Sequence, residues 1–231
     1  MRLLKRLTTI ADMVIRDEPV ADIGADHALL SLYMLEKSII PYAIVTDIIE
    51  GPYERAKMAV ETSPYRDNIE VRKGDGIDII NPHEVATVII AGMGGDVMAD
   101  IISRDWAKAE SFARFILQPM SRPQVIRDIL SKRGWELTEE RVIFENNKFF
   151  VILSYTPAGK PYELTPLEAE IGPLLLAGIY QYKREYLRSF LAKYEGITRS
   201  LEESSGTKEQ MILRAYQEKM HRLEELLNEL S

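Results

Sequence analysis

The chain has 231 residues, of which 46% are hydrophobic and 28% charged, and its formal net charge is -7. This composition is typical of a globular protein with one sizeable core or with one domain and an appendage, and its acidity argues weakly against a nucleic-acid partner. The lack of cysteine excludes disulfide bonds and thiolate nucleophiles, and three scattered histidines argue against a transition-metal site. Because no apolar run is long enough to cross a bilayer and charges interrupt the N-terminus too soon for a signal peptide, we expect a cytoplasmic protein without a membrane or metal partner.

The N-terminal stretch MRLLKRL predicts a short amphipathic helix. Its charged side carries Arg2, Lys5 and Arg6, and leucines form the other side. Such a charged face is by default only solvated. Because this helix precedes the first predicted strand and can lie beside a site there, we interpret the three cations as phosphate contacts.

Seven β-rich runs alternate with helical patterns as far as Thr156. They are PVADIG, YAIVTDI, NIEVRKGD, ATVIIAGMGG, ARFILQPM, WELTEERVIFE and KFFVILSY. Most are apolar on both faces, as the strands of a covered parallel sheet are, and the last two are close enough in sequence to form a hairpin. We therefore predict a doubly wound, seven-stranded α/β domain that ends in an antiparallel strand.

The strand pattern stops after TPAGKPYELTP. Apolar residues then recur at intervals of three and four from Ile179 through Tyr182 to Leu201, and again from Ile212 to Leu230, with EESSGTK as the turn between them. This spacing predicts an antiparallel, coiled-coil-like helical hairpin. We assign residues 1–160 to the α/β domain and 161–231 to the hairpin. A second basic cluster begins the hairpin with Lys183, Arg184 and Arg188.

Acidic residues gather at the ends of the first three predicted strands. The residues concerned are Asp22, Gly24, Asp26, His27, Asp47, Asp75 and Gly76. The carboxyl ends of parallel strands share one edge of a sheet, where open α/β proteins bind their ligands. Asp47 can accept hydrogen bonds from ribose hydroxyls, and Asp75 from an exocyclic amine while the Gly76 amide donates to a ring nitrogen. These strand ends therefore predict an adenosine site.

The first loop lacks the features that hold phosphate. A dinucleotide fingerprint continues after Gly24 with two more glycines, but Asp26 and Ala28 occupy those positions, and no Walker sequence is present. Carboxylates at Asp22 and Asp26 would repel a pyrophosphate and attract a cation. S-adenosylmethionine, an adenosine with a sulfonium and an ammonium, fits these residues better than NAD does.

Each of these residues also has a purely structural interpretation. Asp26 is a suitable N-cap for the helix that follows, and His27 in a first helical turn is more often structural than catalytic. Asp47 can cap the helix near Pro52, and GDG is a common turn. Only the recurrence of acids at three consecutive strand ends favours the ligand site.

The stretch AGMGGDVM, from Ala91 to Met98, follows the most apolar run. One glycine would suffice for a tight turn from strand to helix, whereas this stretch has three glycines in four positions. Bare backbone at a strand end predicts the close approach of a flat ligand.

The segments ADIGADHALL, GPYERA, KGDGIDII and VIIAGMGG, and the run from ILQPM to FFVIL, resemble in order and spacing the bacterial tRNA (adenine(22)-N1)-methyltransferase family. The likeness covers nearly the whole chain, although the hairpin matches only in pattern. It implies a class I methyltransferase domain that uses S-adenosylmethionine to methylate N1 of adenosine 22 in the D-loop region of tRNA, with the hairpin contacting tRNA. Met120 stands where the resemblance leads us to expect asparagine.

The resemblance also implies a set of donor-binding residues along four strand ends. These are Asp22, Gly24 and His27 at the methionine part, Asp47 and Ile48 at the ribose, Asp75 and Gly76 at the adenine, and Ala91, Gly92 and Met93 at the reaction centre.

The chemistry points to one catalytic carboxylate. Adenine N1 has an in-plane lone pair, so alignment with the methyl group rather than deprotonation provides most of the catalysis. Methylation places positive charge on the ring, and a nearby carboxylate would stabilise that charge or accept a proton from N6. Asp26 is the acid of the first loop that remains once Asp22 holds the donor's ammonium, and we take it as the catalytic residue.

Three functions are compatible with these patterns. The favoured one is a tRNA methyltransferase, which AGMGG and the basic N-terminal helix support. The others are a methyltransferase acting on a small molecule or a protein, and a non-catalytic interaction protein that senses a nucleotide; the net acidity favours these two. The sequence leaves the oligomeric state open, with a monomer slightly preferred.

Overall fold

The protein is described by a computed structural model of residues 3–202 and 206–230, and the predicted phosphate contact Arg2 lies outside the described residues. The chain forms two compact units, Met1–Leu164 and Thr165–Ser231, here called the first and the second unit. The division follows Leu164, whereas the sequence suggested a boundary after residue 160.

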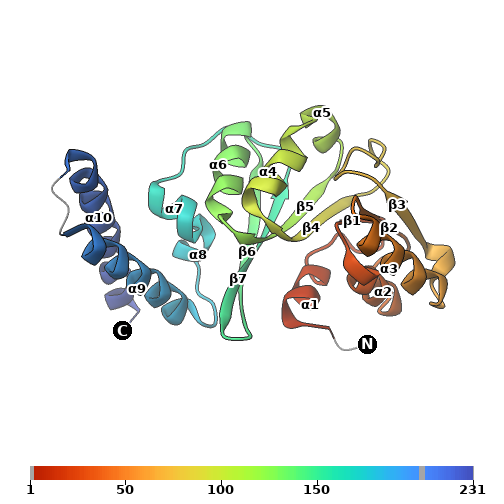
Figure 1. The fold of residues 1–231 in the computed structure, drawn as a ribbon, viewed down its shortest axis with the longest axis horizontal. Helices are drawn as coiled ribbons and strands as arrows, with labels where there is room; N and C mark the ends of the chain where they lie inside the picture. Colours follow the sequence, from red (N-terminus) through yellow and green to blue (C-terminus); the bar gives the residue numbers. More distant parts are fainter. Residues whose placement is uncertain (1–2, 203–205, 231) are drawn as a thin grey trace. The chain divides into compact units, whose positions relative to one another are not determined.

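A seven-stranded sheet in the order β3-β2-β1-β4-β5-β7-β6 forms the centre of the first unit (Figure 1). The strands are β1 Val20–Ile23, β2 Ala43–Asp47, β3 Ile69–Lys73, β4 Thr87–Gly94, β5 Arg114–Ser121, β6 Glu136–Glu145 and β7 Lys148–Thr156. Strands β1 to β5 run parallel, and β7 lies antiparallel between β5 and β6. The predicted doubly wound, seven-stranded domain is confirmed, and its last strand along the chain, β7, is antiparallel as predicted.

Helices cover both faces of this sheet, which explains why its central strands are apolar on both sides. One face carries α1 Lys5–Ala11, α2 Leu29–Glu36 and α3 Glu50–Glu61, and the other carries α4 Gly95–Ser103, α5 Trp106–Ala109 and α6 Pro123–Arg133. Successive residues of a strand point to opposite faces, so Val88 and Ile90 of β4 join one buried cluster while Ile89 joins the other. All residues of β1 and β2 are buried.

The loops after the first three strands meet at one edge of the sheet. β1 pairs with β2 on one side and with β4 on the other, so the chain direction across the sheet reverses beside β1. The N–H of Gly24 donates to the Thr46 carbonyl at 2.7 Å, and the N–H of Gly74 donates to the Asp47 carbonyl at 3.1 Å. These bonds hold the loops together at the switch point, where ligands of open α/β sheets bind.

Residues 157–164 belong to the first unit by their contacts. The N–H of Tyr162 donates to the Ser131 carbonyl at 3.1 Å. Gly134 ends α6 in the left-handed conformation, with φ 87°, and a Cβ there would lie 2.9 Å from the nitrogen of Pro161. The segment therefore packs on α6 before the second unit begins.

The regular secondary structure described for the second unit consists of helices. Its elements are α7 Pro166–Ile171, α8 Pro173–Ala177, α9 Lys183–Glu202 and α10 Thr207–Glu229. The paired helices α9 and α10, which bury Tyr194 and Leu223, confirm the predicted hairpin. Its predicted start was wrong, because Ile179 is 96% exposed and Tyr182, with φ 70°, lies just before α9.

No helix in the described part of the chain is both long and apolar enough to span a membrane.

The fold predicts where the chain can be divided. A chain ending at Leu164 should fold and unfold cooperatively, because it keeps the whole sheet and the segment packed on α6. A chain ending at Thr156 should be less stable by about 1 kcal/mol or more, since it loses the Tyr162 hydrogen bond and the contact of Pro161 with Gly134. Urea unfolding followed by circular dichroism measures both, and equal stability of the two chains would contradict the packing of residues 157–164.

Candidate active site

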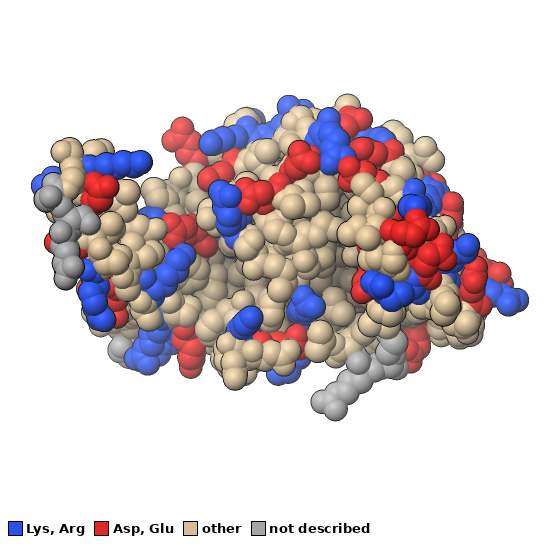
Figure 2. All heavy atoms as spheres, viewed as in Figure 1, with Lys and Arg blue, Asp and Glu red and all other residues tan. Residues whose placement is uncertain are grey.

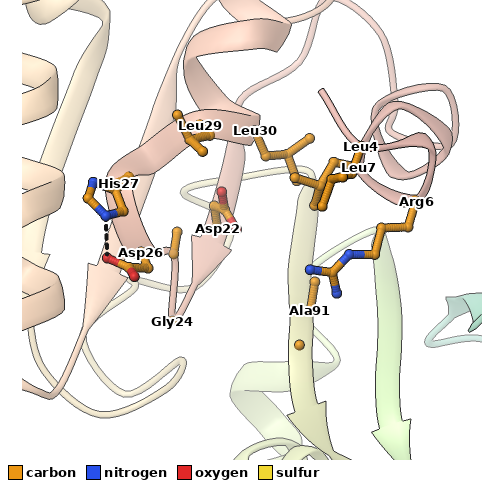
Figure 3. A pocket seen from close by; sticks show the side chains of 12 residues that line it. Leu4, Arg6, Leu7, Asp22, Gly24, Asp26, His27, Leu29, Leu30 and Ala91 are labelled. Atoms are coloured by element: carbon orange, nitrogen blue, oxygen red, sulfur yellow. Dashed lines mark ion pairs between the residues drawn. The ribbon is translucent and has the colours of Figure 1, made fainter. Parts of the chain in front are cut away.

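A pocket of about 280 Å³ lies at the carboxyl ends of β1 and β4, beside α1 (Figure 3). Its walls come from α1, from β1 and the loop after it, from the start of α2 and from β4. The lining residues are Leu4, Arg6, Leu7, Asp22, Gly24, Ala25, Asp26, His27, Leu29, Leu30, Ala91 and Gly92. Six of them, from β1, its loop and β4, were predicted from the sequence as donor-binding or catalytic residues.

Asp22 is the buried charge of this pocket. It is 4% exposed, and the hydroxyl of Ser31 on α2 donates to its Oδ2 at 3.1 Å. No Lys or Arg pairs with it in the described ranges. Burial raises the pKa of Asp22 from 3.8 to about 6, and the Ser31 hydrogen bond offsets this only in part. A cationic ligand group beside Asp22 would supply the missing counter-charge.

Two glycines leave bare backbone at this pocket. Gly24 has φ 71°, and a Cβ there would lie 2.1 Å from Cε of Met93, so the loop after β1 and the end of β4 approach closely. Gly92 has φ 80° and no atom within 4 Å of where its Cβ would stand, which leaves open space beside β4. Glycine is needed at position 95 for a different reason, because a Cβ there would lie 2.2 Å from the Arg122 carbonyl oxygen. One of the three clustered glycines is therefore explained by packing against the loop after β5.

Asp26 is not a helix cap. It begins the short helix η1 Asp26–Ala28, and no side chain caps either η1 or α2. Its Oδ1 accepts a hydrogen bond from Nε of Arg55 on α3 at 2.8 Å, and Nε2 of His27 lies 3.5 Å from the same oxygen. The Arg55 hydrogen bond lowers the pKa of Asp26. The residue therefore stands at the pocket as a half-exposed carboxylate that stays ionised.

The loop that carries Asp26 has an unusual backbone. His27 and Ala28 are successive non-glycine residues with positive φ, at 62° and 50°. Left-handed conformations of such residues cost on the order of 1 kcal/mol each and cluster at functional sites.

Asp47 lies at the end of β2, beside the pocket wall but not in it. It is 9% exposed, and its Oδ1 accepts a hydrogen bond from the N–H of Ile49 at 2.8 Å. Its Oδ2 has no partner among the described residues and can accept a ligand hydroxyl. Ile48 is 56% exposed at the same edge, and Glu50, the next acid along the chain, pairs with Lys73.

Asp75 is already engaged. Arg104 at the end of α4 donates to its Oδ2 at 2.6 Å and also contacts Asp78 and Asp100. Gly76 has φ 55°, and a Cβ there would lie 2.8 Å from Ile101. The backbone therefore turns after β3, and among the described residues Oδ1 is the carboxylate oxygen of Asp75 that has no partner.

The predicted RNA-binding cations have different surroundings. Lys5 and Arg188 are exposed, whereas Arg6 lines the pocket. Lys183 is buried and donates to the carbonyls of Leu176 at 2.7 Å and Gly178 at 2.6 Å, and this burial lowers its pKa. Arg184 donates to the carbonyl of Leu230. The prediction for Lys183 is therefore corrected, since its ammonium donates to backbone carbonyls at the C-terminal end of α8. Basic and acidic side chains are interspersed over the first unit on the face seen in Figure 2.

Sequence reasoning missed the neutral and cationic partners of the site. Ser31, Arg55 and Gln118 contact predicted residues but stand nine or more positions away in the chain, where no local pattern marks them. In the described part of the chain, no three histidine, aspartate or glutamate side chains are grouped so that they could hold a metal ion.

Residues 3–153 match the family model described as a methyltransferase domain. The chain belongs to this family. It is 37% identical over 153 residues to the tRNA (adenine(22)-N(1))-methyltransferase of Bacillus subtilis, and this alignment spans 66% of the chain and 64% of that relative's length.

Two solved structures extend the similarity along the chain. The B. subtilis m1A22 tRNA methyltransferase TrmK has a TM-score of 0.88 at 29% identity, with 98% of this chain and 99% of that chain covered. A putative tRNA (m1A22) methyltransferase of Streptococcus pneumoniae in complex with S-adenosyl-L-methionine has a TM-score of 0.84 at 27% identity, covering 98% and 100%. The resemblance to the tRNA (adenine(22)-N1)-methyltransferase family is thereby confirmed.

The buried carboxylate of Asp22 lowers the free energy of unfolding. Asp22→Asn should stabilise the protein by about 3 kcal/mol near pH 7.5, because the pKa of Asp22 is raised from 3.8 to about 6. A carboxyl group with a raised pKa destabilises the folded state above that pKa, and the penalty disappears as the pH falls toward the unfolded value. Urea unfolding should therefore show that Asp22→Asn increases the free energy of unfolding strongly at about pH 7.5 and only slightly at about pH 4. A loss of stability at the higher pH would contradict the unpaired charge.

Proposed function

We propose that the chain is an S-adenosylmethionine-dependent tRNA methyltransferase that modifies N1 of adenosine 22 in the D-loop region. The observation that carries the proposal is the likeness, over 98% of the chain, to m1A22 methyltransferases, one of them solved with the methyl donor. The pocket at β1 and β4 supports it with a buried acid and open backbone.

The residues of this edge fit the donor. When bound, S-adenosylmethionine supplies a methyl group activated by its sulfonium. Asp22 would hold the donor's ammonium, since its carboxylate is buried and has, within the described ranges, only the Ser31 hydroxyl as a partner. Oδ2 of Asp47 would accept from the ribose, and the turn of Asp75 and Gly76 would hold the adenine through the carboxylate oxygen that Arg104 leaves unused.

The remaining pocket residues would receive the target base. His27 would lie beside the methionine part. Ala91 and Gly92 of β4 line the pocket, with free space beside the backbone of Gly92, and together with Met93 they would face the reaction centre. In tRNA, N1 of the adenine is buried in a base pair or tertiary pair, so the nucleotide must be flipped out, at a cost of a few kcal/mol. The flat, flipped-out base then needs such space.

Asp26 would act through its charge. Arg55 lowers the pKa of Asp26, so the carboxylate is a weak proton acceptor but a constant negative charge. The methylated ring carries positive charge, and a fixed carboxylate at the pocket stabilises that charge as it develops. The role is therefore electrostatic, and proton removal from N6 is left to solvent.

The tRNA would be held by basic side chains that the fold leaves exposed. Lys5 on α1 and Arg188 on α9 are two of these. We propose the second unit as a tRNA-binding surface because its helical pair carries exposed basic side chains such as Arg188, whereas the residues that line the pocket all belong to the first unit.

The proposed reaction predicts a single modified position. The purified full-length chain should transfer labelled methyl groups from S-adenosylmethionine to an unmodified tRNA transcript with adenosine 22, and hydrolysis should yield 1-methyladenosine. A transcript with guanosine at position 22 is the matched control and should stay unlabelled. Labelling of both transcripts, or of neither, would overturn the assignment.

The substitution Asp26→Asn removes the negative charge of the side chain and keeps its shape, so it tests the electrostatic role. The single-turnover rate should fall at least about tenfold while donor and tRNA affinities stay within about threefold, because the interaction strengthens in the transition state. Asp96→Asn is the control, since Asp96 forms a similar half-exposed ion pair with Arg122, at 2.8 Å, and does not line the pocket. A full-rate Asp26→Asn enzyme would remove Asp26 from the mechanism.

A further inference from the structure

Arg104, which directly follows α4, joins three carboxylates. Its Nη1 donates to Oδ2 of Asp75 at 2.6 Å and to Oδ2 of Asp78 at 3.1 Å, and its Nη2 donates to Oδ2 of Asp100 at 2.8 Å. Asp100 belongs to α4 itself, whereas Asp75 and Asp78 belong to the loop after β3. One guanidinium therefore ties the end of a helix to the loop that carries Asp75.

The backbone of this loop is also held without Arg104. Gly76 has φ 55°, and a Cβ there would lie 2.8 Å from Ile101 of α4, so the loop packs directly on that helix. The N–H of Asp78 donates to the Asp75 carbonyl at 3.1 Å, and the ammonium of Lys108 on α5 donates to the Asp78 carbonyl at 2.7 Å. The contribution of Arg104 is therefore the direction of the Asp75 side chain rather than the path of the loop.

The ion pairs of Arg104 stabilise the fold only a little. Its side chain is 35% exposed and those of Asp75 and Asp78 are 43% exposed, so water screens each pair. Their main effect is on geometry, because the planar fork of a guanidinium fixes the orientation of the carboxylates that it binds. Without this cation the three neighbouring carboxylates would repel one another, and Asp75 could turn away.

The Asp75 carboxylate keeps one oxygen for a ligand. Arg104 binds Oδ2, and among the described residues Oδ1 has no partner. An exocyclic amine can donate to a carboxylate oxygen that is held in place, whereas a base without the amine leaves that oxygen unpaired. A site built to hydrogen-bond one ligand group rejects an analogue that lacks the group. A fixed Oδ1 therefore provides selectivity for the amine.

We propose that Arg104 is a positioning residue, which holds Oδ1 of Asp75 toward the base of the methyl donor and so makes the site selective for a purine with a 6-amino group. The inference rests on the proposed function, because it takes S-adenosylmethionine as the donor. The resemblance assigns Asp75 and Gly76 to the adenine, and Arg104 acts on the base only through Asp75.

The test compares two ligands that differ only in the 6-amino group. Calorimetry measures binding of S-adenosylhomocysteine, and of its analogue with hydrogen in place of that amine, to the full-length chain. The wild-type chain should prefer the first ligand by about tenfold or more. Arg104→Met should weaken the first ligand by about threefold to tenfold and leave the second within about twofold, so that most of the preference is lost.

Lys108→Met is the matched control. Lys108 ties the same loop to α5 through the Asp78 carbonyl but does not contact Asp75, so its loss should leave the preference within about twofold. Arg104→Lys keeps the test decisive if Arg104→Met fails to fold. It retains the positive charge without the planar fork, so it should keep part of the preference.

Three outcomes would count against these assignments. An unchanged preference in the Arg104 variants, or equal weakening of both ligands, would overturn the inference, since a purely structural role weakens the two alike. A wild-type chain that binds both ligands equally would refute the contact of Asp75 with the amine, and the inference with it. A wild-type chain that binds neither ligand would refute the proposed function itself.

Discussion

The site depends on one buried carboxylate. Asp22 is the third residue of β1, and its strand lies between β2 and β4, so it is surrounded by sheet and helix on all sides but the pocket. Ser31 of α2 is the one hydrogen-bond donor to its carboxylate among the described residues. A carboxylate in this place raises the free energy of the fold, and a ligand cation would lower it again. The same residue thus links stability to ligand binding.

Most of the fold could be predicted because its signals are local. The seven β-rich runs, most of them apolar on both faces, correspond to the seven strands of the sheet. The short helices α7 and α8 were not predicted, although Thr165 and Glu168 form a capping box at the start of α7, because helices of six and five residues are too short to show a periodicity of apolar residues. Intervals of three and four also placed Ile179 in a helix, but Gly178 precedes it and the chain there is extended into solvent.

The candidate site was predictable only along the strands. Parallel strands bring their carboxyl ends to one edge, so acids at successive strand ends must be neighbours whatever the loops do. The partners of those acids follow from packing between distant segments. Arg6 and Gln118 are 112 positions apart, and Asp26 and Arg55 are 29 apart. Contacts of this kind determine whether a side chain of the site is paired and how it is oriented. No local pattern in the sequence predicts them.

The basic residues show why charge counts say little about an RNA surface. Three of the cations that the sequence assigned to RNA are used inside the protein: Arg6 at Gln118, Lys183 at the carbonyls next to α8, and Arg184 at the end of α10. Each of these cations donates to a neutral oxygen, so it stays charged, but its side chain is fixed and cannot adjust to a phosphate. Affinity for RNA rises with the number of phosphates that mobile, exposed cations neutralise, and not with the total number of Lys and Arg. A chain of net charge -7 can therefore bind RNA through a few exposed cations, and its acids need only be kept from that surface.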